Sequence, residues 1–401
     1  MGEKKMTGFP SREEALRDFF EAWEPPRPAT ELVALDDALG RVTATDTFSK
    51  VALPVYRSSA CDGIAVRSAD FAHGLPDTGS WRLGADYVRA DTGDDFDDAF
   101  DAVIMIEKAA IQADGSVVLD EDVEVGPGSS VNPAGSTIKV GDPLLKAGVV
   151  VRPTDLAALA LGGQAMVEVL RRPRVAFIPT GSELVPAGIQ PLRGQNIDTN
   201  SLMVKHMLIE MGAEPLVFPI VRDDEERLRE AFKEALSQAD IVIVNAGSAV
   251  GQEDFNVSLI EEYGRVVHHY IAAVPGRPLM MAVADGKPAV VLPGPVVAAY
   301  YGTDWCIRAI VARWYGVPMA RHPTVEASFA EDCGSIAPMA NLVKLDVSLD
   351  GQGRYVARPW NIRGGHMAQA LASNAQRVSP IGESHVAAGE PVTVELLRDT
   401  L

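Results

Sequence analysis

The sequence predicts a multidomain α/β protein whose main part is a three-layer αβα sandwich with a parallel-type sheet. Between residues 174 and 315, short apolar runs alternate with segments of helical period, which is the pattern of strands covered by helices. The segments on either side carry short alternating runs among turn residues instead. The chain has 401 residues, 47% of them hydrophobic, and is long enough to bury more than one core.

The N-terminal part is predicted to be helical. Ser11 and Glu14 form the sequence pattern of a capping box, and Phe19 and Trp23 belong to the apolar face of the helix that follows. A second short helix fits residues 35–42.

A β domain is predicted to interrupt this helical part. From residue 51 the helical period disappears, and short strands stand among Gly, Asp and Pro turns. A helix predicted at 153–162 resumes the helical pattern. We therefore expect residues 1–50 and 146–173 to form an N-terminal helical and linker domain, with residues 51–145 inserted as a β domain.

Residues 174–317 are expected to form the αβα domain. The pattern predicts strands at 174–179, 215–220, 240–245, 266–271 and 288–292, and helices at 200–211, 224–238, 254–263 and 297–314. Short strands return after Pro318, at 342–347 and 392–397, which predicts a small C-terminal β domain over residues 318–401.

Polar, glycine-rich segments follow the predicted strands of the αβα domain. Ligands of parallel sheets bind at the carboxyl ends of the strands, so these segments predict a binding rim. Glycine and backbone N–H groups at such turns let a phosphate approach closely, and carboxylates there suit hard cations such as Mg²⁺. The segments are Thr180-Gly-Ser-Glu183, Arg222-Asp-Asp224, Asn245-Ala-Gly-Ser248 and Pro293-Gly-Pro295.

Composition excludes several classes of function. The 36 Lys and Arg residues are outnumbered by 55 Asp and Glu, and the net charge of -19 opposes binding to nucleic acid. No apolar run approaches the ~18 residues of a membrane span, and no signal peptide is recognisable. Cys61, Cys306 and Cys333 show no Cys-x-x-Cys pairing, so we expect reduced thiols and a cytoplasmic protein.

The segment from Leu53 to Arg67 contains Asp62-Gly63, which by itself would be assigned to a tight turn. The whole run, however, resembles the proline, serine and Asp-Gly-Tyr-Ala-Val-Arg signature of the molybdopterin molybdenumtransferases, the family of the bacterial molybdenum cofactor biosynthesis enzyme and the gephyrin E domain. Similar motifs follow in the same order along essentially the whole chain, and the ordered set is more specific than any one of them. They are Thr92-Gly93, Asp101-Ala-Val-Ile104, Pro133-Ala-Gly135, Gly141-Asp142, Thr180-Gly-Ser-Glu-Leu184, Asp198-Thr-Asn200, Gly212-Ala213, Arg222-Asp-Asp224, Gly247-Ser-Ala-Val-Gly251, Pro275-Gly-Arg-Pro278 and Leu292-Pro-Gly294.

The resemblance implies a reaction and an assembly. Adenylylated molybdopterin and molybdate would react, the dithiolene would take up molybdenum, and AMP would be released with help from a divalent metal, for which Mg²⁺ is expected. The family also implies an elongated homodimer in which the β domain of one subunit faces the α/β domain of the other. Other molybdenum cofactor biosynthesis proteins are possible further partners, whereas nucleic acid and membranes are not expected.

The same resemblance implies the site residues. The catalytic residues would be Asp62, Thr92, Glu183 and Asp224, with Asp62, Glu183 and Asp224 also binding the metal. Without the resemblance these four would be interpreted as a turn Asp, a loop Thr, a helix-start Glu and a helix cap. Arg277 is the best candidate to offset the phosphate charge, although a lone Arg is usually just solvated. The full set expected to bind the cofactor is Thr180, Gly181, Ser182, Asn245, Gly247, Ser248, Gly251, Arg277, Pro293 and Gly294.

Five departures from the family motifs favour an alternative. Each lost charged hydrogen bond could be worth ~1.5 to 3 kcal/mol, so several losses together could remove most of the ligand discrimination. The alternative is therefore a non-catalytic paralogue that binds pterin or nucleotide as a carrier, regulator or assembly partner. A scaffold that uses only the dimer is a third, weaker option. Two departures lie near the last strand: Gly294-Pro-Val-Val-Ala298 replaces the family's Gly-Asn-Pro-Val-Ser, and Val274-Pro-Gly-Arg-Pro278 replaces Lys-Pro-Gly-Lys-Pro. The other three are Gly135-Ser-Thr137 for Gly-Glu-Asp, Asn245-Ala-Gly247 for Ser-Gly-Gly, and Arg363-Gly-Gly-His366 for Ser-Gly-Ser-His.

Overall fold

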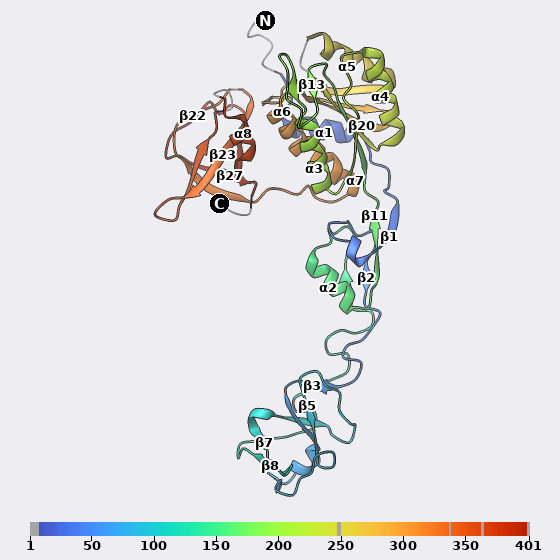
Figure 1. Cartoon of the computed structure of the whole chain (residues 1–401), viewed down its shortest axis with the longest axis vertical. Helices are drawn as coiled ribbons and strands as arrows, with labels where there is room; N and C mark the ends of the chain where they lie inside the picture. Colours follow the sequence, from blue (N-terminus) through green and yellow to red (C-terminus); the bar gives the residue numbers. More distant parts are fainter. Residues whose placement is uncertain (1–7, 247–249, 337, 362–364, 399–401) are drawn as a thin grey trace. The chain divides into compact units, whose positions relative to one another are not determined.

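The computed structural model describes residues 8–246, 250–336, 338–361 and 365–398 (Figure 1). The chain divides into two compact units, each of which is described by itself. The small unit comprises residues 30–170, and the large unit comprises residues 1–29 and 171–401. Within the described ranges, no helix is long and apolar enough to cross a membrane.

A six-stranded sheet forms the centre of the large unit. Its strands lie in the order β15 (Glu214–Val217), β12 (Arg174–Pro179), β16 (Ile241–Ala246), β20 (Lys287–Pro293), β19 (Met280–Ala284) and β17 (Gly264–His269). β16 is buried along its whole length and β12 from its second residue onward, as expected for strands covered on both faces.

The sheet is of the predicted parallel type except for one strand, β19, that the sequence pattern did not reveal. β15, β12, β16 and β20 are parallel, but β19 runs antiparallel to both of its neighbours. The cause is the Asp285-Gly286 turn between β19 and β20, where both residues have positive φ, at 47° and 72°. A two-residue turn of this kind forces an antiparallel hairpin, whereas parallel strands need a long crossover.

Helices cover both faces of this sheet. α4 (Glu225–Gln238) and α5 (Val250–Tyr263) lie on one side, and α3 (Asn200–Glu210), α6 (Val296–Gly302) and α7 (Arg308–Tyr315) lie on the other (Figure 1). Phe232 of α4 and Ile260 of α5 share a buried core with Ile178 and Val244 of the sheet. The single helix predicted at 297–314 is interrupted by a π-helical turn, η5 (Thr303–Ile307), between α6 and α7.

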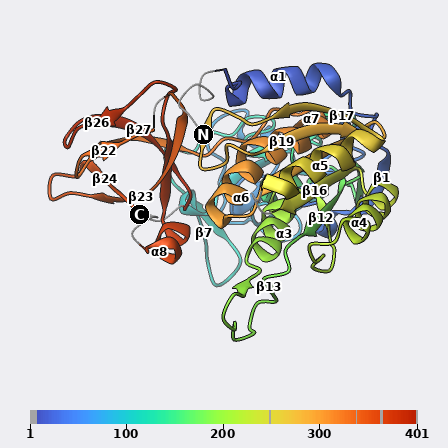
Figure 2. The same cartoon turned by 90° about the horizontal axis from the view of Figure 1, so that it is seen from above.

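Helix α1 (Arg12–Ala22) begins with the predicted capping box but does not belong to the predicted N-terminal domain. It packs against β17 and β19 of the large unit, as Figure 2 shows from above. The side chain of His268 on β17 hydrogen bonds to Asp18 of α1, with 2.9 Å between Nε2 and Oδ2. The assignment of residues 1–29 to one domain with residues 146–173 was therefore wrong, because the helix buries its apolar face on the αβα sheet.

The C-terminal part of the large unit is a closed barrel of five strands. β23 (Ala340–Leu349) pairs with both β24 (Tyr355–Pro359) and β25 (Ala375–Val378), and β21 (Thr324–Phe329) with β27 (Pro391–Leu396) completes the ring. β18 (Ala273–Val274) pairs with β23 and so connects the barrel to the αβα part. Shorter elements of the large unit are β13 (Leu184–Val185), β14 (Asn196–Ile197), β22 (Cys333–Gly334), β26 (His385–Val386) and α8 (Met367–Ala372).

The small unit begins and ends with one antiparallel strand pair. β1 (Thr30–Ala34) pairs with β11 (Met166–Leu170), and helix α2 (Pro153–Leu161) lies just before β11 in sequence. The helix predicted at 35–42 is only a 3-10 turn, η2 (Leu35–Asp37), and Gly40 follows it with a φ of 72° that no helix allows.

Short strands make up the rest of the small unit, as predicted. Its main sheet has β4 (Gly63–Val66) between β5 (Tyr87–Ala90) and β6 (Ala102–Met105), with Ile64, Tyr87 and Ile104 in its core. The other elements are β2 (Thr47–Phe48), β3 (Ser58–Ser59), η3 (Ser68–Phe71), η4 (Ile106–Lys108), β7 (Ala109–Ile111), β8 (Val117–Leu119), β9 (Val131–Asn132) and β10 (Pro143–Leu145).

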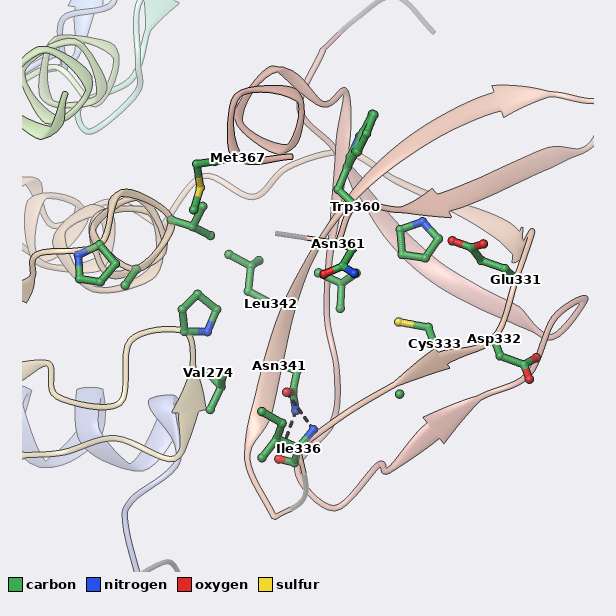
Figure 3. Close-up of a pocket in the computed structure, with 17 residues that line it drawn as sticks. Val274, Glu331, Asp332, Cys333, Ile336, Asn341, Leu342, Trp360, Asn361 and Met367 are labelled. Carbon is green, nitrogen blue, oxygen red and sulfur yellow. Dashed lines mark hydrogen bonds between the residues drawn. The ribbon is translucent and has the colours of Figure 1, made fainter. Parts of the chain in front are cut away.

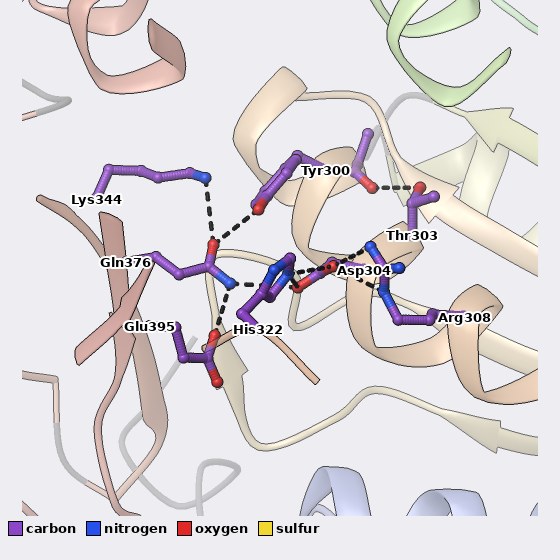
Figure 4. A network of polar contacts seen from close by, with 9 residues as sticks. Tyr300, Thr303, Asp304, Arg308, His322, Lys344, Gln376 and Glu395 are labelled. Atoms are coloured by element: carbon purple, nitrogen blue, oxygen red, sulfur yellow. Dashed lines mark hydrogen bonds and ion pairs between the residues drawn. The ribbon is translucent and has the colours of Figure 1, made fainter. Parts of the chain in front are cut away.

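A buried polar network joins the barrel to the αβα part (Figure 4). At its centre is Gln376 of β25, whose Oε1 accepts from the Tyr300 hydroxyl at 2.9 Å and from Lys344 Nζ at 3.2 Å. Its Nε2 donates to Glu395 at 2.8 Å and to Asp304 at 3.2 Å. Burial lowers the pKa of Lys344 to about 7, so its ammonium group is only partly protonated near neutral pH.

The αβα side of this network is an ionic cluster around Asp304. Arg308 donates to Asp304 Oδ1 at 2.8 Å, and His322 Nε2 lies 3.1 Å from the same atom. Burial alone would raise the pKa of Asp304, but the hydrogen bond to His322 and the charge of Arg308 outweigh it and hold the pKa at about 2. The hydrogen bond to Asp304 in turn raises the pKa of His322.

Candidate functional site

The carboxyl ends of β12, β16 and β20 lie side by side at one edge of the αβα sheet. Together with the residues after β12 and β20 they form the strand-end rim, which contains Thr180 to Glu183, Asn245, Pro293 and Gly294. Thr180 is tied to β16, because its backbone N–H and its hydroxyl each donate to the carbonyl of Asn245 at 3.0 Å. The strand ends predicted from sequence to form a rim therefore lie together.

Two buried side chains, Asn200 and Asn245, form an asparagine clamp below the rim. Asn245 Nδ2 donates to the carbonyls of Leu292 and Pro293 at 3.2 and 3.0 Å. Asn200 Nδ2 donates to Asn245 Oδ1 and to the carbonyl of Gly294, both at 2.8 Å. Asn245 was predicted to bind the cofactor; in the structure its amide nitrogen donates inside the protein and positions the rim.

Sequence reasoning missed the role of Asn200. It was recognised only as part of the Asp198-Thr-Asn200 motif, and its contact with Asn245 connects segments far apart in the chain. Asn200 Oδ1 is buried and has no hydrogen-bond partner within the described part of the structure. A buried acceptor of this kind can be satisfied by a donor from a bound ligand or water.

Gly181 brings a carboxylate over the rim. It has a φ of 145°, and a Cβ placed there would lie 2.6 Å from Glu183 Oε2. Any other residue would displace the Glu183 carboxylate, so glycine is required for the half-buried position that Glu183 occupies.

The two predicted acidic segments of the large unit are linked by reciprocal hydrogen bonds. Ser182 N–H donates to Asp223 Oδ2, and Asp223 N–H donates to Ser182 Oγ, both at 3.0 Å. The neighbouring Asp224 caps α4 by accepting from the backbone N–H of Arg227 at 3.0 Å. Glu183 and Asp224 are therefore the chain neighbours of the hydrogen-bonded pair Ser182 and Asp223. The Asp224 carboxylate is exposed and can accept further hydrogen bonds from a ligand.

Asp62 and Thr92, the predicted catalytic residues of the small unit, are in direct contact. Asp62 Oδ1 accepts from the backbone N–H of Thr92 at 2.7 Å and from its hydroxyl at 2.8 Å. These two hydrogen bonds lower the pKa of Asp62, and both residues are exposed. A fixed, ionised carboxylate at the surface is suited to contact a metal or a hydrogen-bond donor on a ligand.

The remaining predicted residues are less constrained. Arg277 is exposed in the loop between β18 and β19, and its guanidinium has no ion-pair partner among the described residues. Gly251 lies in the first turn of α5, and Gly247 and Ser248 lie outside the described residues.

A complete metal centre is not formed by protein groups alone. In the part of the chain that the structure describes, no three His, Cys, Asp or Glu side chains are close enough to hold a metal ion. Mg²⁺ is commonly bound by one or two carboxylates together with waters and substrate phosphates. The carboxylates of Glu183 and Asp224 fit that pattern only if a ligand supplies the other oxygens.

A cavity of about 700 Å³ lies between the αβα part and the barrel (Figure 3). On the αβα side it is lined by Val274, Pro275, Pro295, Val297 and Ala298, which come from the end of β18 and from the start of α6. Residues of the barrel that line it include Glu331, Cys333, Leu342, Trp360 and Met367. Sequence reasoning did not find this cavity, because its two walls come from domains far apart in the chain.

Two family models match consecutive parts of the chain. Residues 10–163 match the MoeA N-terminal region (domain I and II), and residues 176–313 match a probable molybdopterin binding domain.

Curated relatives and a solved structure match over nearly the full length. The molybdopterin molybdenumtransferase of Haemophilus influenzae is 31% identical over 388 residues, covering 91% of this chain and 93% of the relative. That of Bacillus subtilis is 29% identical, covering 92% and 90%. The crystal structure of a molybdopterin biosynthesis moea protein from Pyrococcus horikosii superposes with a TM-score of 0.78 at 27% identity, covering 98% of this chain and 100% of that one.

Proposed function

The chain belongs to the molybdopterin molybdenumtransferase family, and on that premise we propose that it inserts molybdenum from molybdate into adenylylated molybdopterin and releases AMP. The observation that carries the proposal is the strand-end rim, where the absence of a side chain at Gly181 leaves room for the Glu183 carboxylate beside the end of β12. The reaction exchanges ligands at molybdenum and needs no protein nucleophile, so the main contribution of the protein is to position charged groups.

In this proposal, the glycine turns and backbone N–H groups of the rim bind the phosphate part of the substrate. Arg277 is a cation without an ion-pair partner among the described residues, and it is available to balance phosphate or molybdate charge. Glu183 and Asp224 supply carboxylates to Mg²⁺, which polarises phosphate oxygens when bound. The unpartnered Oδ1 of Asn200 gives the rim an acceptor for a donor group of the nucleotide.

We further propose that Asp62 acts at this site from a second subunit. Asp62 and Thr92 belong to the small unit, whereas the rim belongs to the large unit. Their exposed, prearranged pair supports a role in contacting a ligand held by another surface. We also propose a cytoplasmic location, which the three free cysteines support.

The test is molybdate-dependent AMP release from adenylylated molybdopterin by the purified protein. We expect Asp62→Ala and Glu183→Gln each to abolish release while the circular dichroism spectrum stays unchanged. Glu230→Gln, an exposed residue of α4, is the matched control and should keep the wild-type rate. Wild-type rates in either of the first two variants would overturn the site assignment.

The replaced family motifs favour one competing function, a pterin or nucleotide carrier without turnover. Val274, Pro295 and Ala298 stand where the family has Lys, Asn and Ser, and all three line the cavity. Tight binding of adenylylated molybdopterin with no AMP release on adding molybdate would favour the carrier.

A further inference from the structure

Three of the residues that replace family motif residues lie together and form one wall of the cavity between the αβα part and the barrel. Val274, Pro295 and Ala298 replace a cationic, an amide and a hydroxyl side chain, and each lines the cavity. Pro275 and Val297 complete the same wall. This wall offers apolar surface and no side-chain hydrogen-bond donor.

The charge of the cavity disfavours an oxyanion. Of the described residues that line it, none is Lys, Arg or His, whereas Glu331 and Asp332 are both acidic. Burial raises the pKa of the Cys333 thiol, so this side chain stays neutral. Molybdate or a phosphate group placed here would face like charge, and the described residues that line the cavity offer no cation to compensate it.

The barrel side supplies a complementary polar edge. Figure 3 shows the carboxylate of Glu331 and the sulfur of Cys333 directed toward the interior, whereas Asp332 points away. Asp332 accepts a hydrogen bond from the backbone N–H of Ala388 at 2.8 Å. Glu331 is exposed at the edge of the cavity and has no hydrogen-bond or ion-pair partner among the described residues, so its two oxygens are available to a ligand.

These features select a flat ligand with apolar faces and adjacent N–H donors on one edge. The apolar walls, formed by Val274 and Pro295 on one side and Leu342 and Met367 on the other, suit the faces of an aromatic ring. A carboxylate pairs best with two parallel N–H donors. The amino-pyrimidinone edge of a pterin presents such a pair. The phosphate part of the proposed substrate does not match a cavity whose described lining is acidic and contains no cation.

We propose that this cavity binds the pterin ring of the substrate, with Glu331 accepting hydrogen bonds from the exocyclic amino group and the adjacent ring N–H. The inference rests on the proposed function for the identity of the substrate, and it assigns the ring to a place separate from the strand-end rim. Glu331 is a specificity residue here and takes no part in the transfer of molybdenum.

The test is titration of the full-length protein with unsubstituted pterin at neutral pH, followed by quenching of pterin fluorescence. We expect saturable binding that Glu331→Gln weakens about tenfold or more, because a charge-assisted pair is replaced by a neutral one. Glu326→Gln is the matched control, since Glu326 is exposed on the same barrel and its carboxylate accepts from Thr393. It should bind pterin like the wild type.

A second variant tests the apolar wall. Val274→Lys restores the family's cation, and we expect it to weaken pterin binding and to create binding of molybdate that competes with pterin. Competition between molybdate and pterin in the wild type, or equal pterin affinity in Glu331→Gln and the wild type, would overturn the inference.

The two proposals fail in distinguishable ways. Wild-type AMP release together with pterin binding that ignores Glu331→Gln would refute the cavity assignment and leave the proposed function standing. Pterin binding that depends on Glu331, without any AMP release by the wild type, would support the cavity assignment and refute the transferase function.

Discussion

Asn245 is buried near the end of β16, and its side chain links the end of β20 to the start of α3. Its amide donates to the last two carbonyls of β20 and accepts from Asn200 at the start of α3. The side chain stands where the family has the first Ser of Ser-Gly-Gly, and the chain has lost the amide side chain of the family's Gly-Asn-Pro-Val-Ser. The Asn245 amide therefore bonds to the end of β20, directly before the segment that lacks its own amide side chain.

We expect Asn245→Ala to lower the free energy of unfolding by about 2 kcal/mol, because buried carbonyl groups lose their donors. Urea titration of the two proteins measures this difference. Asn196→Ala, at an exposed position of β14, should change the unfolding free energy by less than about 0.5 kcal/mol. Equal stability of Asn245→Ala and the wild type would show that the clamp is not needed to hold the rim.

The positions of several rim residues could be predicted from the sequence, but their hydrogen-bond partners could not. Thr180, Gly181 and Pro293 could be placed at strand ends, because each directly follows or ends an apolar run. Asp62 and Thr92 were assigned to the site only through the resemblance, and their contact was not predicted. The bonds of Asn200 could not be predicted, since they depend on which loops meet in space.

At the scale of the element, β4 depends on close contact between backbones. It is the central strand of its sheet, and a Cβ on Gly63 would lie only 1.9 Å from the backbone carbonyl oxygen of Ile104 on β6. The strand follows directly after Asp62, so this contact also fixes the position of the Asp62 backbone. The Asp-Gly motif is therefore a packing requirement as well as a turn.

We expect Gly63→Ala to destabilise the small unit by about 3 kcal/mol, because a backbone atom cannot move aside as a side chain can. Hydrogen exchange should show loss of protection in β4, β5 and β6, with β12 and β16 unchanged. Gly126→Ala is the control in the same unit, since its Cβ would be 3.9 Å from the nearest atom. Unchanged protection of β4 in Gly63→Ala would contradict this account.

The stability of the contact between the αβα part and the barrel depends on pH, because the buried polar network contains titratable groups. The pKa of His322 is raised above its ordinary 6.5 by Asp304, so its contribution to stability is complete below pH 6.5 and is lost as the pH rises through the folded pKa. Lys344 has the opposite effect, because its pKa is lowered to about 7 and stability rises with pH above that value.

Comparing His322→Gln with the wild type separates the two effects, since Lys344 is present in both proteins. We expect the variant to have the lower unfolding midpoint at mildly acidic pH, with a difference that shrinks as the pH becomes alkaline. Thermal unfolding across that range provides the measurement. His73→Gln, an exposed position of the small unit, should not change the midpoint. A difference that is constant with pH would exclude the ion pair as its cause.

The elements were largely predictable, and the exceptions have clear causes. The alternating pattern indicated β12, β16, β20, α3 and α4 close to their observed bounds. β19 was missed because the hairpin signal Asp285-Gly286 was not taken into account. The place of α1 was wrong because an amphipathic helix carries no information about which apolar surface will cover it.

At the scale of the whole molecule, the proposed division of the site between two subunits has a direct test. We expect a mixture of inactive Asp62→Ala and Glu183→Gln proteins to recover about one quarter of the wild-type rate after subunit exchange. Half of the dimers would be mixed, and each of these would have one intact site. A mixture that stays inactive, although mass spectrometry shows mixed dimers, would place both residues of each site in one chain.

The chain enters the small unit through β1 and leaves it through β11, and Thr30 stands opposite Leu170 in the register of this pair. A segment with adjacent ends can be removed or replaced by a short turn without rerouting the rest of the polypeptide. The small unit therefore has the topology of an exchangeable cassette, which evolution or a protein engineer can graft between relatives at these two positions.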